Sequence, residues 1–536
     1  MSLLGDIKMY ARFTAGLPAF LKKKITHEEA IAIIRKRLEE REQNFLRLSK
    51  KGIYGHPNSP YLPLLKMAGC EFGDLEQSVK TKGLEPTLHK LKSEGVYVGF
   101  EEFKGRKPMV RGGKTFDVTP HDFDNPHLKH YYYTESGGST GAGTRVASDL
   151  DKYVDRAPSR LLYEHIHGVF DAPLAVWSPI LPGGGFNKMI GNARIGHVPV
   201  KWFSPLTRED LQPAFKYRVA TWYLITVARL LGIPIPSPET VRLNEANKIA
   251  RWMAATVKQY GKCILHGYVS LGVRVAIAAE EEGLDLTGAV FAGSGEPPTP
   301  AKIRHMKNVG ARWIPGYAVS EAGLVGQGCA NPIDENDTHY MKDALVLIEA
   351  PSTVTGTDMT VNGFYLTSLL ASSPKLLLNF ESHDYGILEE RKCGCLYEEL
   401  GFTQHIREVR SVSKLTGEGM TLIGNDLVRV LEEILPSRFG GSAQDYQFEE
   451  EEDQQGLTKL SLIVSPRIQL GNEKEAIDVV LSAMPSGGPG SDLGRAMWLQ
   501  AHTIRVKRAE PIWTGRGKLM PLHLDRTIKK TTTQVS

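Results

Sequence analysis

Cysteine is scarce in this chain of 536 residues. The five cysteines are odd in number and widely scattered. They are Cys70, Cys263, Cys329, Cys393 and Cys395. A secreted disulfide scaffold would need more cysteines, in even number and closer together. The cysteine content therefore predicts a protein of the reducing cytoplasm.

Long hydrophobic runs are also lacking. No uninterrupted apolar stretch approaches the roughly 18 residues that a bilayer-spanning helix needs, so we expect no integral membrane segment. The N-terminal stretch MSLLGDIKMYARFTAGLPAFLKKK carries Asp6, Lys8 and Arg12 within its apolar part. These charges argue against a signal peptide and favour a terminal helix docked on the protein.

A charge excess is the third missing feature. The formal net charge is only +4, which argues against nucleic acid or a polybasic membrane contact as the main partner. Hydrophobic residues make up 41% and charged residues 24% of the chain, the balance of a globular protein with a sizeable core. No internal repeat is visible. The oligomeric state stays open, and a homodimer is compatible with the sequence.

Helical and strand-like patterns alternate along the first 400 residues. Thr26 and Glu29 form a capping-box pattern that opens a helix through HEEAIAIIRKRLEEREQNFLRL. Further helices are expected in LDKYVDRAPSRLLYEHIHGVF and NEANKIARWMAATVKQYG, and strands in APLAVWSPIL, KCILHGYV and LTGAVFAGSG. This alternation predicts an α/β protein with largely parallel strands.

The last 120 residues or so read as a separate α+β unit. A polar stretch with His405, Arg407 and Arg410 comes first, followed by the helical pattern LVRVLEEIL. The acidic run FEEEED is expected to be a solvated loop, and LTKLSLIVSP a strand. The predicted division is a large domain over 1–415 and a small domain over 416–536.

The stretch TESGGSTGAGTRV, from Thr134 to Val146, combines four glycines with hydroxyl side chains. Bare backbone N–H groups and hydroxyls can cradle the oxygens of a polyphosphate. The stretch matches neither G-x-x-x-x-G-K-[ST] nor G-x-G-x-x-G in frame, so a flexible connector is the alternative.

This loop and four later segments resemble motifs of the adenylate-forming superfamily of acyl- and aryl-CoA synthetases. Ser136–Gly141 is similar to its phosphate loop, GSGEPP to its adenine-pocket motif and GYAVSEAG to its G-Y-G-x-[TS]-E motif. HDYG is similar to its G-D-x-G ribose motif and TGRGK to its catalytic-lysine segment. KLTGEGMTLIGNDL resembles the phenylacetate-CoA ligase-like branch.

The resemblance implies a fold and an activity. The fold is a large, multi-subdomain N-terminal adenylation domain, with mixed and parallel sheets flanked by helices, plus a small mobile α+β domain that carries the catalytic lysine. The activity uses ATP and Mg²⁺ to turn a small carboxylic acid into an acyl-adenylate, with release of pyrophosphate. Coenzyme A is the expected acyl acceptor; an amine or a carrier thiol is the alternative.

The resemblance also implies roles for individual residues. Lys518, Glu321 and Ser320 would act in catalysis, with Glu321 binding Mg²⁺ and Ser320 beside the α-phosphate. Tyr317 would stack on adenine, and Asp384 would accept hydrogen bonds from the ribose. The phosphates and the adenine pocket would be served by Ser136, Gly137, Gly138, Ser139, Thr140, Gly141, Arg145, Ser294, Gly295, Glu296 and Pro297.

Two departures leave alternatives open. The ribose-contacting Arg and the acidic pair that the family usually has before its hinge are missing or displaced after Thr416, and Arg407 or Arg410 could take the place of that Arg. The family also often has a lysine after its phosphate loop, where this chain has Arg145. These departures keep open the alternative of a catalytically inactive nucleotide-binding protein. Cys393 and Cys395 suggest zinc, but a Cys-x-Cys pair without a second pair or a nearby histidine in sequence is weak support.

Overall fold

The computed structural model describes residues 3–129, 131–135, 145–181, 183–206, 214–353, 360–411, 414–417, 420–423, 428–483, 489–513, 519 and 522–524. Among these residues, none of the helices has the length and apolarity needed to cross a membrane.

The N-terminal region is helical. Its elements are α1 (Leu3–Lys22), α2 (His27–Glu39), α3 (Arg41–Ser49), the π-helical turn η1 (Lys50–Tyr54), α4 (Leu62–Met67), α5 (Phe72–Lys82), α6 (Leu84–Ser93) and α7 (Phe100–Phe103). The capping box is confirmed: Glu29 N donates to Thr26 Oγ1 (3.2 Å) and Thr26 N to Glu29 Oε2 (3.0 Å). The single helix predicted after it is divided at Glu40 (ψ 17°).

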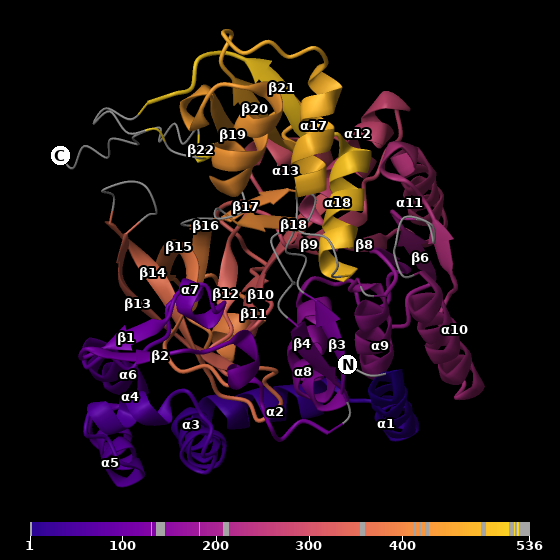
Figure 1. Ribbon diagram of the computed structural model, residues 1–536. Helices are drawn as coiled ribbons and strands as arrows, with labels where there is room; N and C mark the ends of the chain where they lie inside the picture. Colours follow the sequence, from indigo (N-terminus) through magenta and orange to yellow (C-terminus); the bar gives the residue numbers. More distant parts are fainter. Residues whose placement is uncertain are drawn as a thin grey trace, which may run out of the picture.

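A sheet with twelve strands over the described residues crosses the large part of the molecule (Figure 1). One half is parallel, in the order β7 (Pro238–Thr240), β6 (Lys201–Ser204), β5 (Leu174–Trp177), β8 (Cys263–Tyr268), β9 (Ala289–Ser294) and β10 (Arg312–Val319). Every residue of β5 is buried, which explains its unbroken apolar sequence. The helices α11 (Ala246–Tyr260), α12 (Val269–Glu281) and α13 (Pro300–Asn308) contact these strands.

The other half of the sheet is antiparallel. It continues from β10 through β11 (Gly323–Gly328), β12 (Thr338–Tyr340), β16 (Gln404–Ser411), β15 (Phe380–Glu390) and β14 (Thr360–Ser368) to β13 (Leu345–Thr353). The prediction of largely parallel strands is wrong here. Three residues, 320–322, join β10 to β11, and a parallel connection needs a much longer crossover. The mixed α/β fold class itself is confirmed.

Two paired strands flank the glycine-rich stretch in the sequence. β3 (Tyr131–Glu135) pairs antiparallel with β4 (Arg145–Asp149). α8 (Leu150–Ile166) follows at once, capped by the Asp149 side chain, which accepts from Asp151 N. α9 (Gly185–Ile195) and α10 (Ala214–Leu230) come next along the chain. In the hairpin register Glu135 and Arg145, which border the glycine-rich stretch, form one end, and Tyr131 and Asp149, next to the start of α8, form the other.

The C-terminal region forms a small α+β unit at the top of Figure 1. Its sheet has the order β21 (Ile504–Arg508), β20 (Thr458–Val464), β19 (Tyr446–Glu452), β22 (Leu522–Leu524). The hairpin of β17 (Lys414–Gly417) and β18 (Met420–Ile423) precedes this sheet. The described helical segments of the unit are η4 (Val430–Ile434), α16 (Leu435–Phe439), η5 (Ala443–Asp445), α17 (Glu473–Ala483) and α18 (Pro489–Ala501). One buried apolar cluster contains both Trp177 of β5 and Trp498 of α18.

The acidic run is not a loop, as the sequence pattern suggested. Glu449 to Glu452 belong to β19. The Lys507 ammonium lies 2.6 Å from a Glu449 carboxylate oxygen and 2.9 Å from one of Glu451. Cations on β21 therefore offset the repulsion that would oppose a strand of four glutamates.

Candidate active site at the carboxyl edge of the parallel strands

The carboxyl ends of the parallel strands define the candidate site. β5, β8, β9 and β10 run in one direction, so the segments that follow them emerge at one edge of the sheet. Ligands of open α/β sheets bind at this edge. GSGEPP leaves β9 there, and GYAVSEAG leaves the adjacent β10.

The GSGEPP turn is held from inside the protein. Gly293 leaves no room for a side chain, since a Cβ would lie 2.9 Å from the Trp313 ring, and Gly295 has φ +90°. Glu296 is buried: its carboxylate accepts a hydrogen bond from Ser270 Oγ (2.7 Å) and lies 3.7 Å from Lys302 Nζ. With this side chain turned inward, the turn can offer a ligand its backbone.

Tyr317 and Asp384 meet across the sheet. The Tyr317 hydroxyl donates to Asp384 Oδ2 at 3.0 Å, which joins β10 to β15. The Asp384 backbone N–H donates to Ser382 Oγ (3.1 Å). Burial, and then the Asp384 charge, raise the pKa of Tyr317 well above its ordinary value, so the phenol remains a donor. Two motifs that lie 67 residues apart in sequence thus share one contact.

Glu321 lies in the short turn between β10 and β11 and is 5% exposed, whereas the neighbouring Ser320 is exposed. Lys104, directly after α7, donates to Glu321 Oε1 at 2.8 Å. The Lys104 ammonium also lies 5.1 Å from the centre of the Phe100 ring. The donor chemistry of Glu321 therefore suits a cation, but an ammonium group already lies where the sequence predicts Mg²⁺.

Several predicted residues cannot be placed. Ser136, Gly137, Gly138, Ser139, Thr140, Gly141 and Lys518 lie outside the described residues. Arg145 begins β4, opposite Glu135 in the hairpin register. Arg407, considered as a ribose contact, instead pairs with Glu389 (2.8 Å) and Asp334 (2.6 Å).

The sequence analysis missed a row of cations on α8. Lys152, Arg156 and Arg160 recur every four residues, which puts them on one helix face. Arg156 reaches the Glu321 turn, since a Cβ on Gly323 would lie 2.3 Å from its guanidinium. Arg160 donates to the ring of His266 on β8 (3.2 Å). The four-residue spacing in the sequence could have predicted this row of cations.

Lys188 of α9 extends this row. Its ammonium lies 5.6 Å from the centre of the Tyr268 ring, at the end of β8. Burial, and then the charge of Arg160, lower the pKa of Lys188 to about 8. Burial likewise lowers the pKa of Arg160. Cations that repel one another beside the carboxyl edge form a site suited to an anionic ligand.

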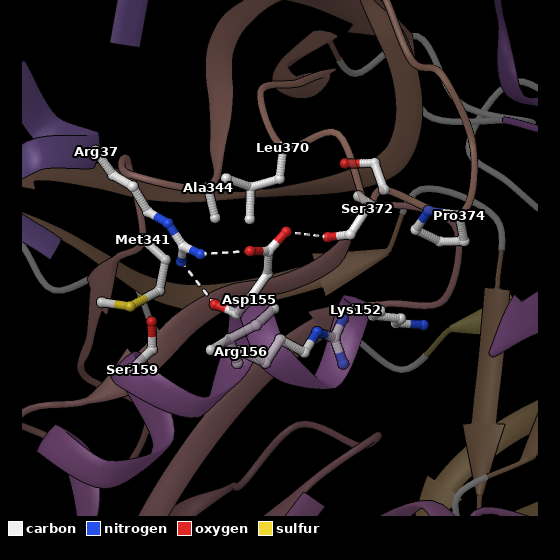
Figure 2. Close-up of a pocket in the computed structure, with 13 residues that line it drawn as sticks. Arg37, Lys152, Asp155, Arg156, Ser159, Met341, Ala344, Leu370, Ser372 and Pro374 are labelled. Carbon is white, nitrogen blue, oxygen red and sulfur yellow. Dashed lines mark hydrogen bonds and ion pairs between the residues drawn. The ribbon is translucent and has the colours of Figure 1, made fainter. Parts of the chain in front are cut away.

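Figure 2 shows a cavity beside the same helix. Asp155 of α8 bridges Arg37 (2.7 Å) and Ser372 (2.5 Å) there, while Lys152 and Arg156 lie along its edge. The cavity volume of about 40 Å³ is far below the roughly 300 Å³ of small ligand sites. The Asp155 contacts therefore anchor α8 and do not form the substrate pocket.

No protein-family model and no curated protein sequence matches this chain. Among solved structures, 2-hydroxyisobutyryl-CoA ligase in complex with 2-HIB-AMP and CoA is similar, with a TM-score of 0.55 at 12% identity, over 91% of this chain and 90% of that chain. An amide bond synthetase from Marinactinospora thermotolerans has a TM-score of 0.39 at 10% identity, over 89% of this chain and 92% of that chain. The o-succinylbenzoate-CoA synthetase from Bacillus subtilis has a TM-score of 0.40 at 9% identity, over 74% of this chain and 69% of that chain.

The first of these similarities establishes the fold. The chain shares its overall α/β fold with 2-hydroxyisobutyryl-CoA ligase, and this is the fold that the ordered motifs predicted. The phenylacetate-CoA ligase-like branch stays a prediction.

Proposed function

We propose that this protein activates a small carboxylic acid with ATP, through an acyl-adenylate and with release of pyrophosphate, and then passes the acyl group to coenzyme A in the cytoplasm. The observation that carries the proposal is the contact between Tyr317 and Asp384. It brings the predicted adenine and ribose residues together at the carboxyl edge of the sheet, beside the GSGEPP turn and Glu321.

The chemistry requires two anions to meet, because a carboxylate attacks the α-phosphate of ATP. The cations on α8 and α9 lower this barrier by attracting both reactants and by stabilising charge on the phosphoryl oxygens. Asp384 fixes the ribose, and Tyr317 packs against adenine. Mg²⁺, when bound beside Glu321, would neutralise phosphate charge. We also propose that 416–536 forms the mobile domain and that Lys518 is its catalytic lysine.

Carboxylate-dependent exchange of pyrophosphate into ATP tests the activity. We expect exchange with one member of a panel of aryl, short-chain and hydroxy acids, followed by consumption of coenzyme A. Exchange without thioester formation would assign the acyl group to an amine or a carrier thiol. ATP binding without exchange for any acid would contradict the proposal and indicate a nucleotide-binding protein without catalysis.

Lys188 gives the site a predicted pH dependence. We expect ATP affinity to fall by about 10-fold or more as pH rises through the Lys188 pKa of about 8, because the site loses a charge-assisted contact. The free energy of unfolding of the ligand-free protein should instead increase with pH. The pKa of Lys188 in the folded protein lies below its ordinary value of 10.5, so Lys188 binds its proton more tightly in the unfolded chain. Stability therefore rises as the pH increases from about 8 to 10.5.

Calorimetric titration with ATP at several pH values measures the affinity. Lys188→Arg keeps its charge and should remove the fall, whereas Lys201→Arg, at an exposed pair with Glu239, should leave it unchanged. An identical pH profile in Lys188→Arg would exclude Lys188 from anion binding.

A further inference from the structure

A cluster of sulfur and imidazole donors lies in the antiparallel half of the sheet, apart from the proposed active site. Cys329, His339, Cys393 and His405 each place one donor atom within 4.8 Å of the others. Cys395 adds a fifth donor, with Sγ 3.4 Å from Cys393 Sγ and 3.2 Å from His339 Nε2. The Cys-x-Cys pair thus acquires partners that its sequence neighbourhood does not contain.

The spacing of three donors matches one tetrahedral ion. Zinc bonds of about 2.3 Å to sulfur and about 2.0 Å to nitrogen put two sulfurs roughly 3.8 Å apart and a sulfur and a nitrogen roughly 3.5 Å apart, and the observed distances of 3.4, 3.2 and 3.6 Å lie within about 0.4 Å of these values. Cys393 Sγ lies 3.6 Å from His339 Nε2, which closes a triangle with the two distances to Cys395 Sγ. A zinc ion bound to these three donor atoms would require little movement of any of them.

Surrounding groups orient the donors. His339 Nδ1 is 2.8 Å from the Phe402 carbonyl, which places the ring proton there and turns the Nε2 lone pair toward the sulfurs. Cys329 Sγ accepts from Asn331 N and from the Arg391 guanidinium, both at 3.3 Å. N–H donors and a nearby cation favour a thiolate, and such outer contacts are typical of metal sites.

The Cys-x-Cys turn is itself held in shape. The Cys393 and Gly394 backbone N–H groups both donate to Glu398 Oε2 at 2.6 Å, and Glu398 belongs to α14 (Leu396–Glu399). Gly394 has φ +71°, a conformation that favours glycine. Both sulfurs therefore face one point, because the turn is fixed by hydrogen bonds that do not use them.

We propose that this cluster binds one zinc ion through Nε2 of His339 and the thiolates of Cys393, Cys395 and Cys329. Three thiols lose their protons to solvent on binding, and the resulting net charge of −1 lies beside the Arg391 guanidinium, which also pairs with Asp337. Four protein ligands leave no position for a substrate, so the ion stabilises the fold and has no catalytic role. It ties together the end of β11, β12 and the turn that leads into α14.

The ion also supports the nucleotide-binding strand from a distance. His405 lies opposite Glu389 on β15, five residues along the strand from Asp384. That spacing amounts to roughly 17 Å, which places the zinc outside the reaction. Loss of zinc should therefore lower the stability of the antiparallel half without removing any ligand of ATP.

Metal analysis of the full chain, purified under reducing conditions, tests the site. We expect about one zinc per chain, since one tetrahedral set of donors is present. Cobalt in place of zinc should give thiolate-to-metal charge-transfer bands and tetrahedral d–d bands. Zinc-free wild-type protein, or a Cys393–Cys395 disulfide in mass spectra of the freshly purified chain, would overturn the proposal.

Single substitutions assign the ligands. Cys393→Ser, Cys395→Ser and His339→Asn should each lose zinc, whereas Cys70→Ser, outside the cluster, should keep it. Cys329→Ser should lose zinc and His405→Asn retain it; the reverse result would overturn Cys329 as the fourth ligand. If the variants do not fold, the wild-type protein provides the test. A chelator together with a thiol-blocking mercurial removes zinc, and this should lower the midpoint temperature of thermal unfolding. An unchanged midpoint would refute the structural role.

Discussion

Glu321→Gln is expected to reduce the rate of acid-dependent pyrophosphate exchange by about 10²- to 10³-fold, the usual cost of removing one electrostatic contact from a transition state. The substitution keeps the shape of the side chain and removes its charge. It also leaves the Lys104 ammonium, whose side chain is 11% exposed, without the carboxylate at 2.8 Å. Breaking a buried pair in this way should destabilise the protein by about 3–5 kcal/mol.

The two effects can be separated. Lys104→Met combined with Glu321→Gln removes both charges, so stability should recover in large part while exchange stays low. Glu102→Gln is the matched control, because Glu102 of α7, two residues before Lys104, forms a similar buried pair with Arg111 (2.8 Å). It should lose stability and keep exchange. Recovery of exchange in the double variant would show that Glu321 acts only in folding.

Residues close together in sequence were predictable. Tyr317, Ser320 and Glu321 lie in one β-turn-β segment, so the local pattern GYAVSEAG reports their arrangement directly. The capping box of α2 is likewise local. The ordered motifs also indicated the fold: GSGEPP and GYAVSEAG mark the ends of the adjacent strands β9 and β10, and HDYG lies within β15 of the same sheet.

Contacts between distant residues were not predictable. Lys104 is 217 residues from Glu321 and comes to the site at the end of α7, which packs against β15. Zinc donors at 329 and 339 join the Cys-x-Cys turn because β12 pairs with β16, a pairing without a signature in one sequence. The direction of the strands after β10 depends on a three-residue turn that periodicity does not reveal.

Lys302→Met should destabilise the junction between the large part of the protein and the C-terminal unit. Lys302 is 1% exposed, and its ammonium lies 3.7 Å from Glu296 in the GSGEPP turn and 3.9 Å from Glu452 of β19. It also donates to Thr458 Oγ1 of β20 (3.3 Å). Removing this charge leaves the Glu296 carboxylate buried near a neutral side chain, which should cost about 3–5 kcal/mol.

Lys307→Met, on the same helix, is the matched control, because its pair with Glu335 involves a lysine side chain that is 65% exposed and should contribute at most about 1 kcal/mol. Chemical denaturation followed by tryptophan fluorescence measures the stability of both variants. Limited proteolysis should cut Lys302→Met between the two units faster than wild type. If Glu296 shapes the adenine pocket, ATP affinity must fall in Lys302→Met as well. Equal stability and equal ATP affinity in the two variants would mean that Lys302 links neither the turn nor the C-terminal unit to the site.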